Sequence, residues 1–321
     1  MPSSSSEPAF APAPSPPPAL PAGEGARGPV ALALAALETL RPYQWLKNVL
    51  VFVPLAAAHR LDDLVLLGAA ARAWLAFTLC AASIYVINDL RDADADRLHP
   101  HKHDRPIASG RLPPLLAAGL VPLLLAGSLV AVVSLGLKAA LALGLYFVLM
   151  VAYSLRLKGI VLLDALILAA GYALRVIEGG FAVHILPSAR LLAFCMFIFF
   201  SLALIKRYAE LALMRSRDGS TAHARGYLLE DQEYLMALGC SSGVLSVVVL
   251  ALYMSSTHVT QLYSRSELIW FTTILLLYWI SHMWLMAHRA RMTDDPLVFA
   301  LKNPVSLVLI LSMGVTAWLA V

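Results

Sequence analysis

Residues 71–96 read ARAWLAFTLCAASIYVINDLRDADAD, an apolar run of helix length followed at once by a cluster of acids. The whole chain of 321 residues is similarly apolar: 60% of its residues are hydrophobic, 14% are charged and the mean hydropathy is +0.76. Soluble globular proteins carry about 25% charged residues. The composition therefore indicates an integral membrane protein. The net charge of +4 does not indicate nucleic-acid binding, because the basic residues follow the loops between apolar runs.

The apolar runs recur along the chain at the spacing of membrane-spanning helices, each of which needs about 20 residues. We expect spans at 43–58, 71–87, 114–134, 139–155, 160–182, 191–212, 234–256, 268–288 and 303–321. Residues 61–70 are expected to form a short interfacial helix, because Arg72 would lie inside a span that began at 64. Residues 1–30 are rich in Pro, Ser, Ala and Gly and predict a disordered tail. The expected fold is therefore an all-α bundle of about nine transmembrane helices over 40–321.

The lysines and arginines concentrate in alternate loops. With the N-terminus inside, 18 of them lie on the inner side and 5 on the outer side, while Arg175 falls within a span. Cytoplasmic loops carry the excess of Lys and Arg. We therefore expect a multi-pass protein of the plasma (inner) membrane with a cytoplasmic N-terminus and an external C-terminus. Its longest inward loops, 88–112 and 213–233, predict chemistry on the cytoplasmic side.

Three of the acids that follow the second expected helix share one helical face. At about 100° per residue, Asp92 lies about 60° back from Asp89, and Asp96 lies about 40° forward of Asp92. Asp94 falls about 140° away from Asp89, whereas Asn88 is adjacent and can add an amide oxygen. Such oxygen ligands suit Mg²⁺, which commonly shares its coordination with substrate phosphates. Asn88, Asp89, Asp92 and Asp96 are therefore candidate ligands of a magnesium-diphosphate site. The alternative is a solvated acidic helix end.

A basic turn follows these acids, with the sequence HKHDRPIASG over 101–110. Pro106 and Gly110 indicate an ordered turn rather than further helix. Lys102 and Arg105 within it suit phosphate oxygens beside a metal. The general excess of basic residues on cytoplasmic loops would also explain either of them alone. It explains less well why a basic turn directly follows a cluster of acids.

These motifs together resemble the UbiA-type intramembrane prenyltransferase superfamily. The pattern N-D-x-x-D-x-x-x-D from Asn88 to Asp96 matches its first signature, and Lys102-x-x-Arg105-Pro106-Ile107 matches the basic turn after it. Tyr153 and Lys158, at the end of the fourth expected helix, resemble a further family motif. The resemblance implies a helical bundle around a central cavity, with Mg²⁺-bound diphosphate at the cytoplasmic end and a lateral opening to lipid.

The chain departs from many family members after its sixth expected helix. Where they carry a second Asp-rich motif, this sequence has Lys206-Arg207-Tyr208-Ala209-Glu210. Further bases follow at Arg215, Arg217 and Arg225. We therefore expect Lys206, Arg207 and Glu210 to contact substrate rather than to complete a second metal site.

The basic pattern suits two phosphorylated substrates. With the motif from Arg41 to Asn48, it resembles the decaprenyl-phosphate phosphoribosyltransferase branch, in which a polyprenyl phosphate attacks phosphoribosyl diphosphate. Lys47 is then a candidate phosphate ligand, or else a lysine that snorkels at the membrane surface. The alternative enzyme moves a polyprenyl group from its diphosphate to an aromatic acceptor such as 4-hydroxybenzoate. A transporter is the remaining alternative and would need polar or broken helices at mid-membrane. The sequence predicts no oligomeric state.

Charged residues also occur within or beside the fifth expected span. Arg175 and Glu178 are three residues apart and are expected to pair. They either line the cavity and touch substrate or form a structural pair. Asp164 has two equally weighted interpretations: it lines the cavity, or it packs within the bundle. Asp294 and Asp295 are interpreted as a solvated turn with a helix N-cap role.

Overall fold

A computed structural model of the chain describes residues 28–98, 102–215, 226–292 and 295–321, and every element in those ranges is an α- or 3-10 helix. Seven of the helices are long and apolar enough to cross a membrane. They are α3 (Leu64–Arg91), α5 (Pro114–Val133), α6 (Leu137–Leu155), α7 (Leu163–Ala182), α8 (Ala189–Arg215), α9 (Gln232–Met254) and α11 (Ser266–His288). The all-α membrane bundle is thus confirmed.

The last expected span is a bent pair of helices. Helix α12 (Pro296–Lys302) and helix α13 (Pro304–Ala320) meet at 87°, and together they pass as one further span. Asn303 separates them and accepts a hydrogen bond from Ser306 N at 2.9 Å, which caps α13 at its N-terminus. The described residues therefore hold seven or eight candidate spans, against the nine expected.

The first expected span, 43–58, is not a single helix. It consists of the 3-10 helix η1 (Pro42–Phe52) and the short helix α2 (Val53–Ala57), and α1 (Pro29–Thr39) precedes them. Arg41 adopts the left-handed conformation with φ 53° and breaks the path between α1 and η1. Helix α1 begins before the expected domain start at 40, and residues 1–27 of the expected tail lie outside the described residues.

The expected interfacial helix at 61–70 is wrong. Asp63 caps α3 by accepting hydrogen bonds from Val65 N and Leu66 N, and α3 then runs unbroken from residue 64 to residue 91. Arg72 is accommodated because its side chain is exposed and donates to Ser134 Oγ at 3.0 Å, close to the end of the helix. A long cationic side chain near a helix end can reach polar surroundings in this way.

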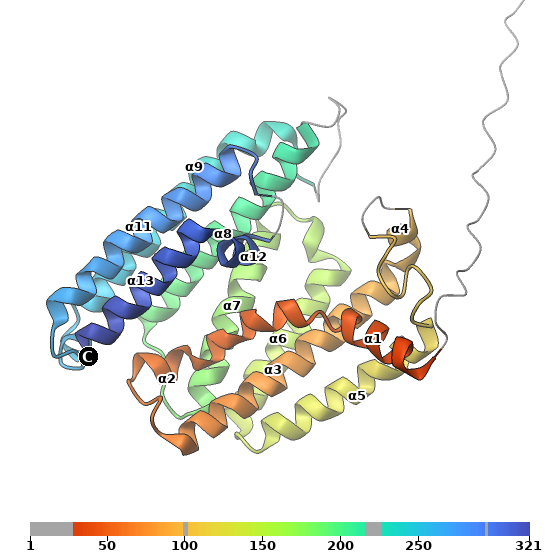
Figure 1. Cartoon of the computed structure of the whole chain (residues 1–321), viewed down its shortest axis with the longest axis horizontal. Helices are drawn as coiled ribbons and strands as arrows, with labels where there is room; N and C mark the ends of the chain where they lie inside the picture. The colour runs from red at the N-terminus through yellow and green to blue at the C-terminus, as the bar shows by residue number, and fades with distance from the viewer. Residues whose placement is uncertain (1–27, 99–101, 216–225, 293–294) are drawn as a thin grey trace, which may run out of the picture.

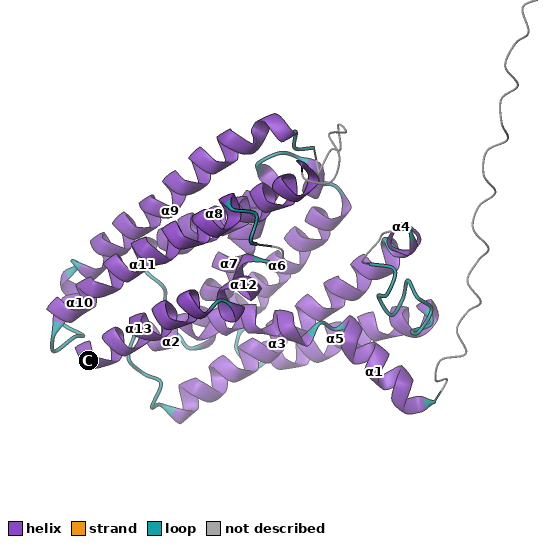
Figure 2. Ribbon diagram, turned by 45° about the horizontal axis from the view of Figure 1, so that its top comes forward, coloured by secondary structure: helices purple, strands orange, loops and turns teal. Residues whose placement is uncertain are grey.

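The helical bundle has two ends, at which different segments of the chain meet. One end holds helix α4 (Ala93–Arg97), η2 (Leu157–Gly159) and the ends of α3, α6, α8 and α11 (Figure 1). Three contacts join these segments in turn: Asp92 with Lys158, Tyr153 with Arg207, and Tyr208 with His288. The opposite end carries the C-terminus, where Arg265 N donates to Ala320 O, and the contact between His59 and Tyr263. The turned view in Figure 2 separates α3 and α5 from the group formed by α8, α9, α11 and α13.

Helix η1 packs against both α3 and α7 in the middle of the bundle. Gly179 on α7 makes this possible, because a Cβ atom there would lie 2.0 Å from the carbonyl oxygen of Val51. The close approach brings the polar face of η1 onto the inside of the bundle, and this placement positions the candidate site.

Candidate active site

The acidic cluster lies where α3 passes into α4. Asp92 N donates to Asn88 O at 2.9 Å and Asp96 N donates to Asp92 O at 2.8 Å, so helical phase is kept across the short break at Asp92. The side chains of Asp89 and Asp96 consequently share one face, and both are buried. Asn88 lines the adjoining cavity.

Two guanidinium groups hold these buried carboxylates. Arg105 Nη1 lies 3.1 Å from Asp89 Oδ1 and 2.6 Å from Asp96 Oδ2, so one cationic atom bridges both. Arg41 Nη2 lies 2.5 Å from the same oxygen of Asp89. Lys102 stands near Arg105 in the lining of the outer mouth defined below. The structure thus brings Arg105 of the basic turn together with two of the three expected carboxylates, Asp89 and Asp96.

The remaining expected carboxylate, Asp92, has a different partner. Asp92 Oδ2 lies 3.4 Å from Lys158 Nζ on η2, and both side chains are about one-third exposed. Asp94 pairs with Arg97 at 2.5 Å, and its side chain is 95% exposed, pointing away from the cluster. Within the described ranges, no three His, Cys, Asp or Glu side chains form a ready metal-binding group.

The donor set nevertheless fits Mg²⁺. A single nitrogen already contacts carboxylate oxygens of both Asp89 and Asp96, so these two oxygens converge on one cationic position. Mg²⁺ is usually held by one or two carboxylates, with waters and substrate phosphates completing its coordination. Two converging carboxylates beside an open cavity meet that requirement without a third.

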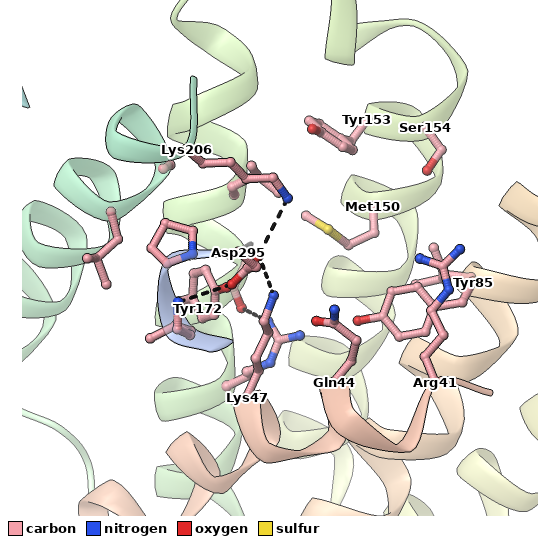
Figure 3. Close-up of a pocket in the computed structure, with 18 of the residues that line it drawn as sticks. Arg41, Gln44, Lys47, Tyr85, Met150, Tyr153, Ser154, Tyr172, Lys206 and Asp295 are labelled. Carbon is pink, nitrogen blue, oxygen red and sulfur yellow. Dashed lines mark hydrogen bonds and ion pairs between the residues drawn. The ribbon is translucent and has the colours of Figure 1, made fainter. Parts of the chain in front are cut away.

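A central cavity of about 250 Å³ lies between these carboxylates and the middle of the bundle. Five basic residues line it: Arg41, Lys47, Arg175, Lys206 and Arg207. Four tyrosines also line it: Tyr85, Tyr146, Tyr153 and Tyr172. Figure 3 shows side chains from η1 and from the facing helices pointing into this space. Asp295 is the one acid among these described lining residues, so basic side chains outnumber acidic ones five to one, and the aromatic rings carry hydroxyl groups.

Arg175 is buried at the inner wall of the cavity. Its Nε donates to Asn48 Oδ1 at 2.8 Å, and its Nη2 donates to Tyr146 OH at 3.0 Å. The guanidinium also lies over the rings of Phe77, Tyr146 and Tyr172 at 4.8–5.3 Å. The expected pair with Glu178 is not formed, because Asn48 and Tyr146 take the donors of Arg175. Glu178 is fully buried, and neither of its carboxylate oxygens has a hydrogen-bond partner.

Arg207 on α8 is the centre of a second buried network. Its Nε lies 2.6 Å from Asp164 Oδ2, its Nη1 lies 2.6 Å from Glu210 Oε2, and its Nη2 donates to Tyr153 OH at 3.2 Å. Tyr227 OH donates to the other oxygen of Asp164 at 2.6 Å. Asp164 is thus a fully buried partner that orients Arg207, rather than a residue of the cavity wall.

Lys206, next to Arg207, points toward Lys47 across the cavity. Their ammonium groups lie 3.4 and 2.9 Å from one oxygen of Asp295, between the two lysines (Figure 3). The expected N-cap role of Asp295 is confirmed, since its other oxygen accepts a hydrogen bond from Leu297 N at 3.2 Å. The prediction that Asp295 lies in a solvated turn is wrong, because its side chain is only 16% exposed. Burial raises the pKa of Asp295, but the two ammonium groups outweigh it and hold that pKa below its ordinary value.

Some residues named from the sequence lie outside the described residues: Arg217 and Arg225, within 216–225, and Asp294.

Two further spaces open from the central cavity. An outer mouth of about 620 Å³ shares Gln44, Lys206 and Asp295 with it and also contains Lys102, Arg105 and Glu210. An apolar groove of about 430 Å³ shares Lys47, Leu202 and Leu297 with the cavity. The groove runs between η1 and the helices α8, α11, α12 and α13, with a lining that is almost wholly apolar. It has the character needed to hold a hydrocarbon chain.

Sequence comparison places this geometry in context. The model of the UbiA prenyltransferase family matches residues 48–307. Nodulation protein NoeC of Azorhizobium caulinodans is 36% identical over 280 residues, which cover 86% of this chain and 90% of that protein. The protein y4nM of Sinorhizobium fredii is 35% identical and matches 84% of this chain, but the chain spans only about half (52%) of its length.

A second group of relatives is matched over a shorter region. Decaprenyl-phosphate phosphoribosyltransferase of Mycobacterium tuberculosis is 33% identical over 189 residues, which are 58% of this chain and 63% of that protein. Among solved structures, a UbiA homologue from Archaeoglobus fulgidus bound to GPP and Mg²⁺ gives a TM-score of 0.62 at 17% identity. The match covers 88% of this chain and 99% of the archaeal one, and it supports the shared fold.

Proposed function

Because the chain belongs to the UbiA prenyltransferase family and is therefore a transferase, we propose that it transfers 5-phosphoribosyl from phosphoribosyl diphosphate to a polyprenyl (decaprenyl) phosphate. Diphosphate is the second product. The reaction takes place in the plasma membrane, with the site facing the cytoplasm.

The observation that carries this proposal is the cationic lining of the central cavity. Among the described residues, five basic side chains line about 250 Å³ together with a single acid, Asp295, and one of the five, Arg41, also contacts Asp89 of the proposed metal site. A donor with a 5-phosphate and a diphosphate, together with a lipid phosphate, brings several anionic groups that such a lining can bind. The partial match to decaprenyl-phosphate phosphoribosyltransferase agrees with this choice.

The proposed reaction needs no proton from the protein. An oxygen of the lipid phosphate supplies an electron pair to the anomeric carbon, and the bond from that carbon to the diphosphate oxygen breaks, so the pair leaves with diphosphate. Arg105 and Arg41 release the carboxylates of Asp89 and Asp96 and turn to the diphosphate oxygens. The low-dielectric, preorganised charges of the site are worth more there than in water.

Mg²⁺, held by Asp89 and Asp96 with Asn88 and Asp92 beside them, would neutralise charge on the departing diphosphate. Lys158 contacts Asp92, and Lys102 lines the outer mouth together with Arg105, so both add positive charge for the phosphate groups. Arg175, Arg207 and Glu210 position the sugar side of the donor, with Tyr153 fixing Arg207.

The cytoplasmic orientation is part of the proposal. The outer mouth is lined by basic residues from three expected inward loops, and Lys158 from a further one contacts Asp92; the residues at the mouth are Lys102, Arg105, Lys206 and Lys302. Both the excess of basic residues on cytoplasmic loops and the water solubility of the sugar donor favour this end as the inner one.

The alternative is an aromatic prenyltransferase that uses a polyprenyl diphosphate. The four tyrosines of the cavity and the apolar groove favour it, since rings can hold an aromatic acceptor and the groove can hold the prenyl chain. In that reaction the lipid would be the donor, and its diphosphate would lie at Asp89.

One assay separates the two. Protein purified in detergent is incubated with Mg²⁺, decaprenyl phosphate and phosphoribosyl diphosphate labelled in the sugar, and a parallel sample receives polyprenyl diphosphate with labelled 4-hydroxybenzoate. We expect label to enter the lipid phase in the first sample only. Label transfer in the second sample alone would overturn the proposal in favour of the alternative. Asp89→Asn serves as the inactive control and Asp94→Asn as its matched exposed control.

A further inference from the structure

Asp295 is the single acid among the described residues that line the central cavity. One of its oxygens contacts both Lys47, at 2.9 Å, and Lys206, at 3.4 Å. Its other oxygen is fixed by Leu297 N at 3.2 Å. Lys47 comes from η1 and Lys206 from α8, so a single carboxylate joins elements that are far apart in the sequence (Figure 3).

The three residues stand where the three spaces meet. Lys47 lines both the central cavity and the apolar groove, whereas Lys206 and Asp295 line both the cavity and the outer mouth. A lipid whose chain lies in the groove therefore presents its head group first to Lys47. The two ammonium groups are the nearest pair of positive charges available to that head group.

We propose that Asp295 is an internal competitor for the acceptor phosphate: its carboxylate and the phosphate of the lipid bind the same two ammonium groups in turn. This inference rests on the proposed function for the identity of the lipid. It makes Asp295 a specificity-determining residue that acts at the lysine pair and is not in contact with the metal.

The charge balance gives the competition a direction. A phosphomonoester dianion neutralises the two lysines by itself, so Asp295 is released when the substrate binds. Transfer converts that dianion into a phosphodiester with a single negative charge, which leaves one positive charge for the carboxylate to neutralise. Asp295 therefore returns as the product forms, and its return favours release of the product.

The test is direct binding of decaprenyl phosphate, without donor or metal, to the detergent-solubilised wild type and to Asp295→Asn. Asparagine keeps the N-cap acceptor but removes the competing charge. We expect the dissociation constant to fall about tenfold, the order that one charge-assisted hydrogen bond contributes. In turnover assays KM for the lipid and kcat should fall together, because the product is also held more tightly.

The controls isolate the charge at this position. Asp295→Ser also caps a helix without a charge and should tighten binding in the same way, whereas Asp94→Asn should not change it. Binding of uncharged decaprenol should be equal in all variants. Unchanged or weaker binding of decaprenyl phosphate in both Asp295 variants would overturn the inference. If the wild type binds only polyprenyl diphosphate and the Asp295 variants bind it more tightly, the competition stands while the proposed acceptor fails.

Discussion

Replacement of Asp89 by Asn tests the proposed metal site most sharply. Asp89 is 3% exposed and accepts from Arg41 at 2.5 Å and from Arg105 at 3.1 Å. The amide has nearly the same shape and can still accept one hydrogen bond, but it lacks the charge that would hold Mg²⁺ in the proposed site. The change therefore removes electrostatics with little change in volume.

The expected magnitude follows from that geometry. Loss of one preorganised group that stabilises developing charge costs about 10²–10³ in kcat, or about 2.7–4 kcal/mol. The two guanidinium groups, no longer paired with Asp89, remain available to diphosphate, so KM for the donor should stay unchanged or fall. The combined signature is a low kcat with no rise in KM for the donor.

The assay is diphosphate release from purified protein over a range of Mg²⁺ concentrations. Asp94→Asn is the matched control, because Asp94 is on the same short segment but is 95% exposed and faces Arg97. The control should retain wild-type turnover at every Mg²⁺ concentration. If Asp89→Asn retained more than half of that turnover while remaining folded, the proposed role of this carboxylate would be refuted.

Three other predictions concern the buried charges. Asp164→Asn removes the partner of Arg207, and breaking a buried ion pair costs about 3–5 kcal/mol, so the thermal midpoint in detergent should fall clearly. Arg175→Gln removes a desolvated cation from three aromatic rings, which should cost about 2 kcal/mol of stability and lower the thermal midpoint. Arg175→Lys should restore only part of this loss, because lysine lacks the planar fork that reaches Tyr146. The pKa of Asp295 is lower in the folded protein than the ordinary aspartate value of about 3.9, so its ion pairs stabilise the fold above that pH. This stabilisation is lost as the pH falls through the folded pKa. The difference in thermal midpoint between wild type and Asp295→Asn should therefore persist down to about pH 5 and shrink below pH 4.

Local periodicity was sufficient to predict part of the acidic cluster. The shared face of Asp89 and Asp96 follows from the 3.6-residue helical repeat, because backbone hydrogen bonds continue across Asp92. The same arithmetic placed Asp94 on another face, where its side chain is exposed. The basic partner of both carboxylates, Arg105, also lay within the motif that follows.

The sequence could not predict contacts made over long separations. Arg175 and Glu178 have the spacing of a helical pair, yet Arg175 is turned toward Asn48, which lies 127 residues earlier. Asp295 resembled a solvated turn because its partner Lys47 is 248 residues away. Hydropathy could not predict η1 either, since an apolar segment has the same composition whether it forms one α-helix or a 3-10 helix followed by the short helix α2.

The order of charges along the path from groove to mouth bears on which substrate is the lipid. The apolar groove meets the cavity at Lys47, Leu202 and Leu297, so a lipid head group that arrives there reaches the lysine pair before it reaches Asp89. A prenyl diphosphate donor would have to carry its head group past both lysines to the carboxylates, and the reacting carbon of its chain would follow into a cationic cavity. A lipid phosphate acceptor needs only to present its head group at the lysines, while a water-soluble donor places its diphosphate at the carboxylates from the mouth. The second arrangement pairs each anionic group with the nearest positive charge, and it joins the basic lining of the cavity as a reason for proposing the phosphoribosyl reaction.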